Sequence, residues 1–148
     1  MIPISPDRVV EEFLRVVPNA RTVLDDLAAS DPESYGAWLE GRVDDMLEFF
    51  LQAFTRPVLL PLLREDSPSP MDEAAIRACF EYVEGLVLGD DSYLESSLYF
   101  GIVEQFMEGK EMIRRAYFYS LPATRAEVVS LIERYPETFR SLRAELEL

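Results

Sequence analysis

The chain has 148 residues, of which 49% are hydrophobic, and its 28 acidic against 14 basic residues give a formal net charge of −14. This length and apolar content suit one domain with a single core, so we expect one helical domain over 1–148 and little disorder. Because so negative a body repels phosphate groups, we expect no nucleic-acid partner.

The apolar segments predict neither a membrane span nor export. Pro57, Pro61 and Gly101 interrupt the longest uncharged runs, which are shorter than the roughly 20 residues that a spanning helix needs. No basic segment followed by an apolar stretch stands at the N-terminus, and Cys79 is the only cysteine. We therefore expect a cytoplasmic protein with no membrane partner.

The first two expected helices form a short hairpin. Ser5 is suited to the N-cap and Pro6 to the first helical position of a helix that ends at Pro18-Asn19. A second helix with a weaker apolar pattern follows over 20–29.

The longest helix is expected over 34–54. Its apolar stripe marks it as the central helix: Tyr35, Trp38, Leu39, Val43, Met46, Leu47, Phe50 and Phe54. Pro57 and Pro61 then interrupt the apolar run 58–63, which predicts a kinked short helix. The segment 65–70 is rich in proline and serine and predicts a linker.

Two helices folded back on each other are expected over 71–107. Gly89 is suited to the left-handed conformation that ends the first, and Asp90 or Asp91 to the N-cap of the second. The apolar stripes of the two arms match, and Gly101 leaves a low point where a partner helix can approach closely.

Three further helices complete the prediction. One covers 112–119, one begins at Ala123 or Thr124, and Pro136 opens the last. The expected fold class is therefore all-α, a compact bundle of about seven or eight helices around the central helical hairpin.

Negative charge is concentrated in this hairpin. Residues 72–108 hold nine acids and one arginine, a net charge of −8, whereas 109–148 hold six acids and seven bases. We predict a partner-binding surface on the hairpin, extended by a second acidic group before Phe49; its residues are Glu81, Glu84, Asp90, Asp91, Glu95, Asp44, Asp45 and Glu48.

Enzymatic readings are disfavoured because the chain has no histidine, the commonest general base and a frequent metal ligand. Paired carboxylates such as Glu104 and Glu108 can in principle hold a metal, but solvated helix faces explain them better. Cys79 lies in an apolar stripe and is expected in the core. We expect no catalytic residue, metal or cofactor.

A second surface candidate is the compact group of cations and aromatic residues over 114–119. Arg114, Arg115, Tyr117 and Phe118 cannot all face inward. The alternative is that Arg114 or Arg115 neutralises the acidic hairpin from across the fold.

The hairpin also carries a resemblance. Residues 79–86, 89–91, 93–95 and 98–106 look like a bacterial family of small, all-helical, mostly uncharacterised proteins that is often placed among polymorphic-toxin immunity proteins. The resemblance covers the middle of the chain, rests on helix packing and transfers no catalytic residue. It implies a protein that binds and blocks a toxin.

We therefore expect a non-enzymatic acidic binding protein with a protein partner, for which a basic toxin domain is the candidate. Two alternatives stay open: a helical scaffold or oligomer subunit without a toxin, and a carboxylate-dependent metalloenzyme. The residues leave the oligomeric state undecided.

Overall fold

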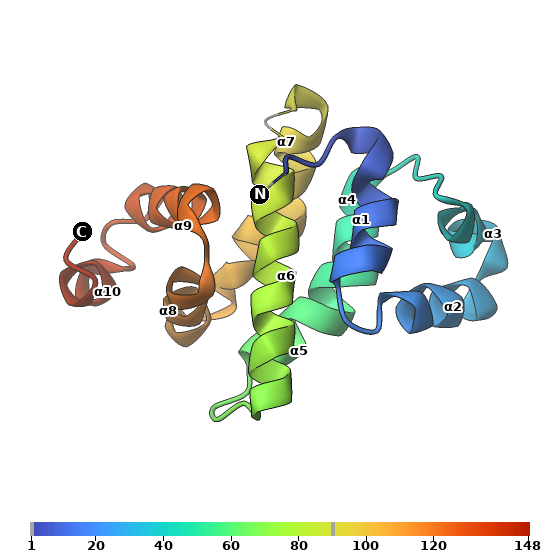
Figure 1. The fold of residues 1–148 in the computed structure, drawn as a ribbon. Coiled ribbons are helices and arrows are strands. Elements are labelled where there is room, and N and C mark those ends of the chain that lie inside the picture. Colours follow the sequence, from blue (N-terminus) through green and yellow to red (C-terminus); the bar gives the residue numbers. More distant parts are fainter. Residues whose placement is uncertain (1, 90) are drawn as a thin grey trace.

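The computed structural model describes residues 2–89 and 91–148, and Figure 1 shows their arrangement. Labels with α mark α-helices, and labels with η mark 3-10 or π-helices. In chain order the elements are η1 (Pro6–Arg8), α1 (Val9–Val16), α2 (Ala20–Ser30), α3 (Pro32–Tyr35), η2 (Gly36–Glu40), α4 (Met46–Phe49), η3 (Phe50–Leu59), α5 (Leu60–Leu63), α6 (Pro70–Leu88), α7 (Ser92–Leu98), η4 (Tyr99–Val103), η5 (Glu104–Glu108), α8 (Lys110–Tyr119), α9 (Pro122–Arg134) and α10 (Arg140–Glu145).

The all-α class is confirmed, since the described residues form helices and connecting segments without a strand. Helix α6 stands in the middle of the molecule, with α1 to α5 on one side and α8 to α10 on the other (Figure 1). Helices α1 and α9 both pack along α6. The arrangement is consistent with the predicted bundle of about seven or eight helices.

Local signals explain why α6 begins where it does. The Ser69 side chain accepts a hydrogen bond from the backbone N–H of Asp72 at 3.1 Å, and Pro70 occupies the first turn. In the interior, α6 contributes Tyr82, whose hydroxyl donates to the Val9 carbonyl at 2.9 Å. Because a buried hydroxyl needs a partner, this bond fixes α1 against α6.

An aromatic cluster fills the core between α1, α6 and the segment from α4 to η3. The Phe13 ring lies 5.3 Å from Phe49 and 6.3 Å from Phe54, and Phe54 lies 5.2 Å from Tyr82, measured between centroids. All four side chains are fully buried. Edge-on packing of this kind adds to the stabilisation from burial alone.

The prediction of one long helix over 34–54 is wrong. Gly41, at φ 81°, ends η2, and a new helix begins when the Asp45 carboxylate accepts from the Glu48 N–H at 3.1 Å. Left-handed backbone at a glycine stops a helix, and an aspartate at the N-cap starts one. The apolar spacing over 34–54 therefore spans a helix boundary.

The kinked short helix expected over 58–63 is instead the end of a longer helical segment. Helical backbone continues from Met46 to Leu63 through Pro57 and Pro61. Pro57 lies in the π-helical segment η3, whose wider turn accommodates a proline ring that would strike the preceding turn of an α-helix. By length and composition Met46–Leu63 could cross a membrane, but 56% of it is buried inside the fold, as in a core helix.

The reversal between α6 and α7 is present, with one correction. Gly89 is right-handed, at φ −62°, so it does not end α6 in the predicted way. A Cβ at Gly89 would collide with the Ile4 carbonyl, because the N-terminal segment crosses α6 there. Asp91 caps α7 as predicted and accepts from the Tyr93 N–H at 2.8 Å, whereas Asp90 lies outside the described residues.

The second arm packs largely against α4 and η3. A Cβ at Gly101 would lie 3.0 Å from Phe50 Cβ and 3.3 Å from Leu47 Cδ1, so the predicted close crossing exists with a different helix. Thr55 Oγ1 donates to the Gly101 carbonyl at 2.6 Å and ties η3 to η4. The last helix differs as well, since α10 begins at Arg140 after a turn and not at Pro136.

Candidate partner-binding site

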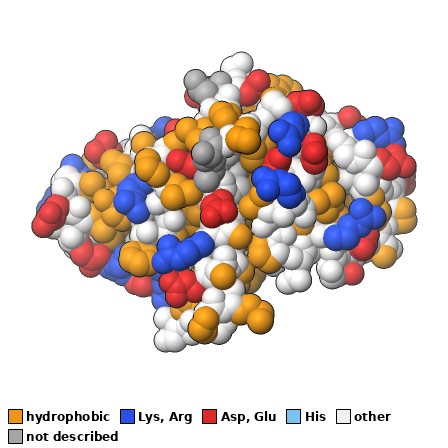
Figure 2. All heavy atoms as spheres, in the orientation of Figure 1, with side chains coloured by type: hydrophobic (Ala, Val, Ile, Leu, Met, Phe, Trp, Pro, Cys, Tyr) orange, Lys and Arg blue, Asp and Glu red, His pale blue; other side chains and the backbone are white. Residues whose placement is uncertain are grey.

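Six of the eight predicted carboxylates are exposed or half-buried and form no ion pair with another described residue. They are Glu81, Asp91, Glu95, Asp44, Asp45 and Glu48. Figure 2 shows acidic and basic side chains interspersed on one face of the molecule. The ion pairs among the described residues involve carboxylates other than these six.

Glu84 is not part of a binding surface, which corrects the prediction. Its side chain is buried at 5% exposure, and its carboxylate accepts from the Ala123 N–H at 3.0 Å and the Thr124 N–H at 2.8 Å. The Thr124 hydroxyl donates to the same carboxylate at 2.8 Å. Because the first N–H groups of a helix lack partners within it, Glu84 of α6 acts as the cap of α9.

The remaining acids occupy three places. Asp91 and Glu95 line one groove at α7, and Glu81 lines another beside the N-terminal segment and Arg8. Asp44 and Asp45 precede α4, which packs against α7. Asp44, Asp45 and Glu48 line neither of these two grooves, so the predicted residues do not form one continuous site.

The groove at α7, here called the α7 groove, is a candidate site because it gathers two of the predicted carboxylates, Asp91 and Glu95. It has a volume of about 320 Å³ and lies between the end of α6, the α7–η4 segment and α9. Its lining is Val87, Asp91, Glu95, Ser96, Leu98, Tyr99, Phe100, Val103, Glu127 and Arg134. Three carboxylates and one arginine, Arg134, thus line the groove together with apolar side chains.

Aromatic side chains form part of its edge. Tyr99 and Phe100 line the groove, and Phe100 is 48% exposed. The Arg134 guanidinium lies 4.7 Å from the centroid of the Tyr99 ring, a cation–π contact. Exposed aromatic residues beside unpaired charges are typical of protein interfaces.

Sequence reasoning missed Glu127 and Arg134. Both belong to α9, and only the packing of α9 against α6 and η4 brings them to Glu95. Their own neighbourhood in the sequence reads as an ordinary solvated helix face. No local pattern could have placed them in this site.

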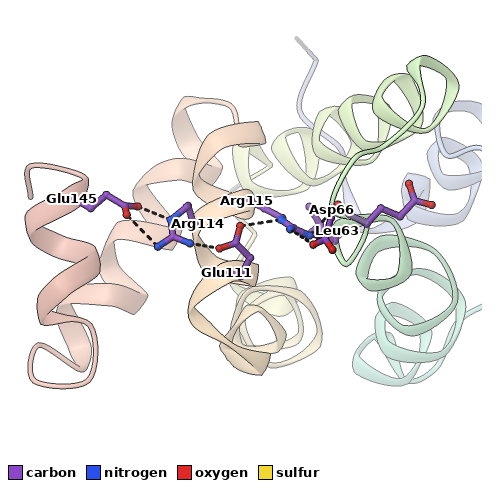
Figure 3. Close-up of polar contacts among 7 residues, drawn as sticks. Leu63, Asp66, Glu111, Arg114, Arg115 and Glu145 are labelled. Atoms are coloured by element: carbon purple, nitrogen blue, oxygen red, sulfur yellow. Dashed lines mark hydrogen bonds and ion pairs between the residues drawn. The ribbon is translucent and has the colours of Figure 1, made fainter.

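The two arginines of the cation and aromatic group over 114–119 form contacts within the fold (Figure 3). Arg114 Nε donates to Glu145 Oε2 at 2.5 Å and its Nη1 contacts Glu111, so this side chain joins α8 to α10. Glu145 lies in α10 and Glu111 in α8. Arg114 therefore pairs with carboxylates of α8 and α10, and the alternative that it neutralises the acidic hairpin is wrong.

Arg115 is bound to the segment before α6. Its Nη1 donates to the carbonyls of Leu63 at 2.7 Å and Glu65 at 3.0 Å, and its Nη2 to Asp66 Oδ1 at 2.8 Å (Figure 3). The side chain is 19% exposed. Phe118, at 63% exposure, is the member of the group that stays available to solvent.

Nucleophilic and metal chemistry finds little support in the described residues. Burial raises the pKa of the Cys79 thiol to about 12, so the thiol stays protonated at neutral pH. No group of three or more Cys, Asp or Glu side chains within 2–89 and 91–148 is placed to hold a metal ion.

Comparison of the chain with protein-family models, with curated proteins and with solved structures finds no match.

Proposed function

We propose that the protein is a non-enzymatic acidic binding protein that engages a basic protein partner through the α7 groove and the adjoining start of α4. The observation that carries the proposal is the gathering of Asp91, Glu95 and Glu127 around one groove beside exposed Phe100. Asp91 and Glu95 have no ion pair among the described residues.

The charge distribution supports a basic partner. The formal net charge of −14 attracts cationic surfaces at long range, and unpaired carboxylates at the contact select them at short range. A toxin that acts on nucleic acid needs a basic cleft, which an acidic helical protein can occupy. An immunity-type inhibitor of such a toxin is the most specific form of the proposal.

The test uses a partner isolated with the tagged protein, measured by stopped-flow association. We expect kon to fall by about tenfold or more between low and physiological salt, because charge steering is screened over about 10 Å. Asp91→Asn combined with Glu95→Gln should slow association, and Asn at position 91 retains a side chain that can cap α7.

The matched control removes the same charge elsewhere. Asp26→Asn combined with Glu33→Gln alters two exposed acids of α2 and α3 that form no ion pair with a described residue. Both double variants should keep wild-type circular dichroism. Salt-independent association, or equal slowing by the control pair, contradicts the proposal.

A second candidate is an oligomer subunit, favoured by the exposure of Met71 at 81% and Phe118 at 63%. Large exposed apolar side chains are common at subunit contacts. Light scattering after gel filtration separates the two candidates: a stable oligomer that Phe118→Ser dissociates favours this one.

A further inference from the structure

A second and larger groove lies at the opposite end of α6 from the α7 groove. Its volume is about 840 Å³, and its walls come from the turn between α1 and α2, from η3 and α5, and from the first turns of α6. The lining residues are Pro18, Asn19, Thr22, Val23, Pro57, Val58, Pro61, Leu62, Glu65, Met71, Asp72, Ala74 and Ala75. We call it the α5–α6 groove.

Small and rigid side chains keep this groove open. Ala74 and Ala75 on α6 face a wall that contains Pro57 and Pro61, and both prolines are exposed. Alanine has no side-chain atoms beyond Cβ, and the proline ring is short and rigid. Neither side chain can extend across the groove. Met71, a large apolar residue at its edge, is 81% exposed. An apolar surface of this shape remains uncovered in the monomer.

Two carboxylates stand among these apolar walls. Glu65 and Asp72 both line the groove, and neither forms an ion pair with another described residue. Burial, and then the interaction with the Asp72 carboxyl, raises the pKa of Glu65 above its ordinary value. Two neighbouring carboxylates repel each other when no cation pairs with them. An ammonium or guanidinium group of a ligand would reduce this repulsion.

We propose that the α5–α6 groove binds an amphipathic helix of a partner protein, with its apolar side chains against Val58 and Ala75 and a lysine or arginine between Glu65 and Asp72. The small residues allow close approach of a helix, and the carboxylate pair fixes its register. This site is separate from the α7 groove, so the two proposals stand or fall independently.

A second copy of this chain is the less suitable occupant. Each copy carries a formal net charge of −14, and the groove itself contributes two carboxylates to the contact. Bringing two such surfaces together places like charges side by side, which is unfavourable. A basic amphipathic helix brings positive charge to the groove and therefore avoids this repulsion.

The probe is a fluorescein-labelled peptide of 18 residues built from leucine and lysine at helical spacing, with a second peptide in which glutamate replaces lysine. Binding is measured by anisotropy at physiological salt. We expect the lysine peptide to bind and the glutamate peptide to fail. Glu65→Gln combined with Asp72→Asn should weaken binding by about tenfold, as loss of two partly exposed charge contacts implies.

Ala74→Trp tests the groove by filling it. Ala74 is exposed, so the larger side chain should leave the fold intact and still reduce peptide binding by about tenfold or more. The control is Asp26→Asn combined with Glu33→Gln, which removes the same charge from exposed positions on α2 and α3 and should change the Kd less than about twofold.

Amide chemical shifts of the labelled protein locate the peptide. Perturbations at Thr22, Val23, Ala74 and Ala75 support the proposal. Perturbations confined to α7 and α9, or a loss of binding with the α7 variants alone, overturn it. Light scattering that shows a dimer disrupted by Ala74→Trp also overturns it, because a second copy would then be the occupant.

Discussion

The carboxylate of Glu84 caps the first turn of α9, where the Glu84 Oε1 atom accepts hydrogen bonds from both the backbone N–H and the hydroxyl of Thr124 at 2.8 Å. Helix α9 has no capping side chain of its own, since Leu121 precedes Pro122. A residue of α6 therefore supplies the acceptor that the local sequence lacks. The buried charge is held by three donors and by the positive end of the α9 dipole.

Glu84→Gln should destabilise the fold by about 2–4 kcal/mol, because the amide NH2 must face an N–H donor and the charged acceptor is lost. Urea unfolding followed by circular dichroism measures the change. Glu81→Gln, on the exposed side of the same helix, is the control and should stay within about 0.5 kcal/mol of wild type. Equal effects of the two substitutions would show that Glu84 does not carry the cap.

Gly101→Leu should destabilise by about 1–3 kcal/mol through overpacking, since the added side chain meets Phe50 and Leu47. The melting temperature reports the loss. Gly36 offers the matched control, because it is helical and a Cβ there would have no neighbour within 4 Å. Gly36→Ala should therefore be neutral or slightly stabilising. An unchanged melting temperature for Gly101→Leu would mean that η3 and η4 do not cross there.

Cys79 should not react with Ellman's reagent in the native state, because the thiol is fully buried and its pKa is raised to about 12. Reaction should appear with the unfolding transition in urea and follow the same midpoint. Rapid labelling without denaturant would place the thiol at the surface or show frequent local opening of α6.

The Arg114–Glu145 contact makes α10 docking depend on pH. Arg114 hydrogen-bonds to Glu145 and thereby lowers the pKa of that carboxyl below its ordinary value of 4.5. A depressed pKa in the folded state means that the contribution is present above pH 4.5 and is lost as pH falls through the folded-state pKa. Glu145→Gln should therefore lower the melting temperature slightly at pH 7, and the difference should be smaller at pH 3, which lies below the ordinary value; differential scanning fluorimetry makes the comparison. A constant difference at both pH values would exclude the charge as its cause.

The sequence by itself determined the elements whose signals are local. Pro6 in the first turn of η1, the break at Pro18-Asn19, the Asp91 cap of α7 and the helix near 112–119 all depend on residues within a few positions of one another. Such signals act through a single backbone turn, so they can be read before the fold is known. The all-α class follows from the same periodicity.

Only the tertiary structure decided which carboxylates are buried or exposed. It also decided the helix boundaries that no local sequence signal marks. Apolar spacing over 34–54 ignores the left-handed turn at Gly41, and a π-helical segment carries the chain past Pro57 where an α-helix would break. Glu81 and Glu84 look equivalent in the sequence, yet the start of α9, about forty residues later, buries one and leaves the other exposed. A carboxylate can be buried only where hydrogen-bond donors without other partners lie within reach. The donors for Glu84 belong to α9, so their position depends on how distant helices pack.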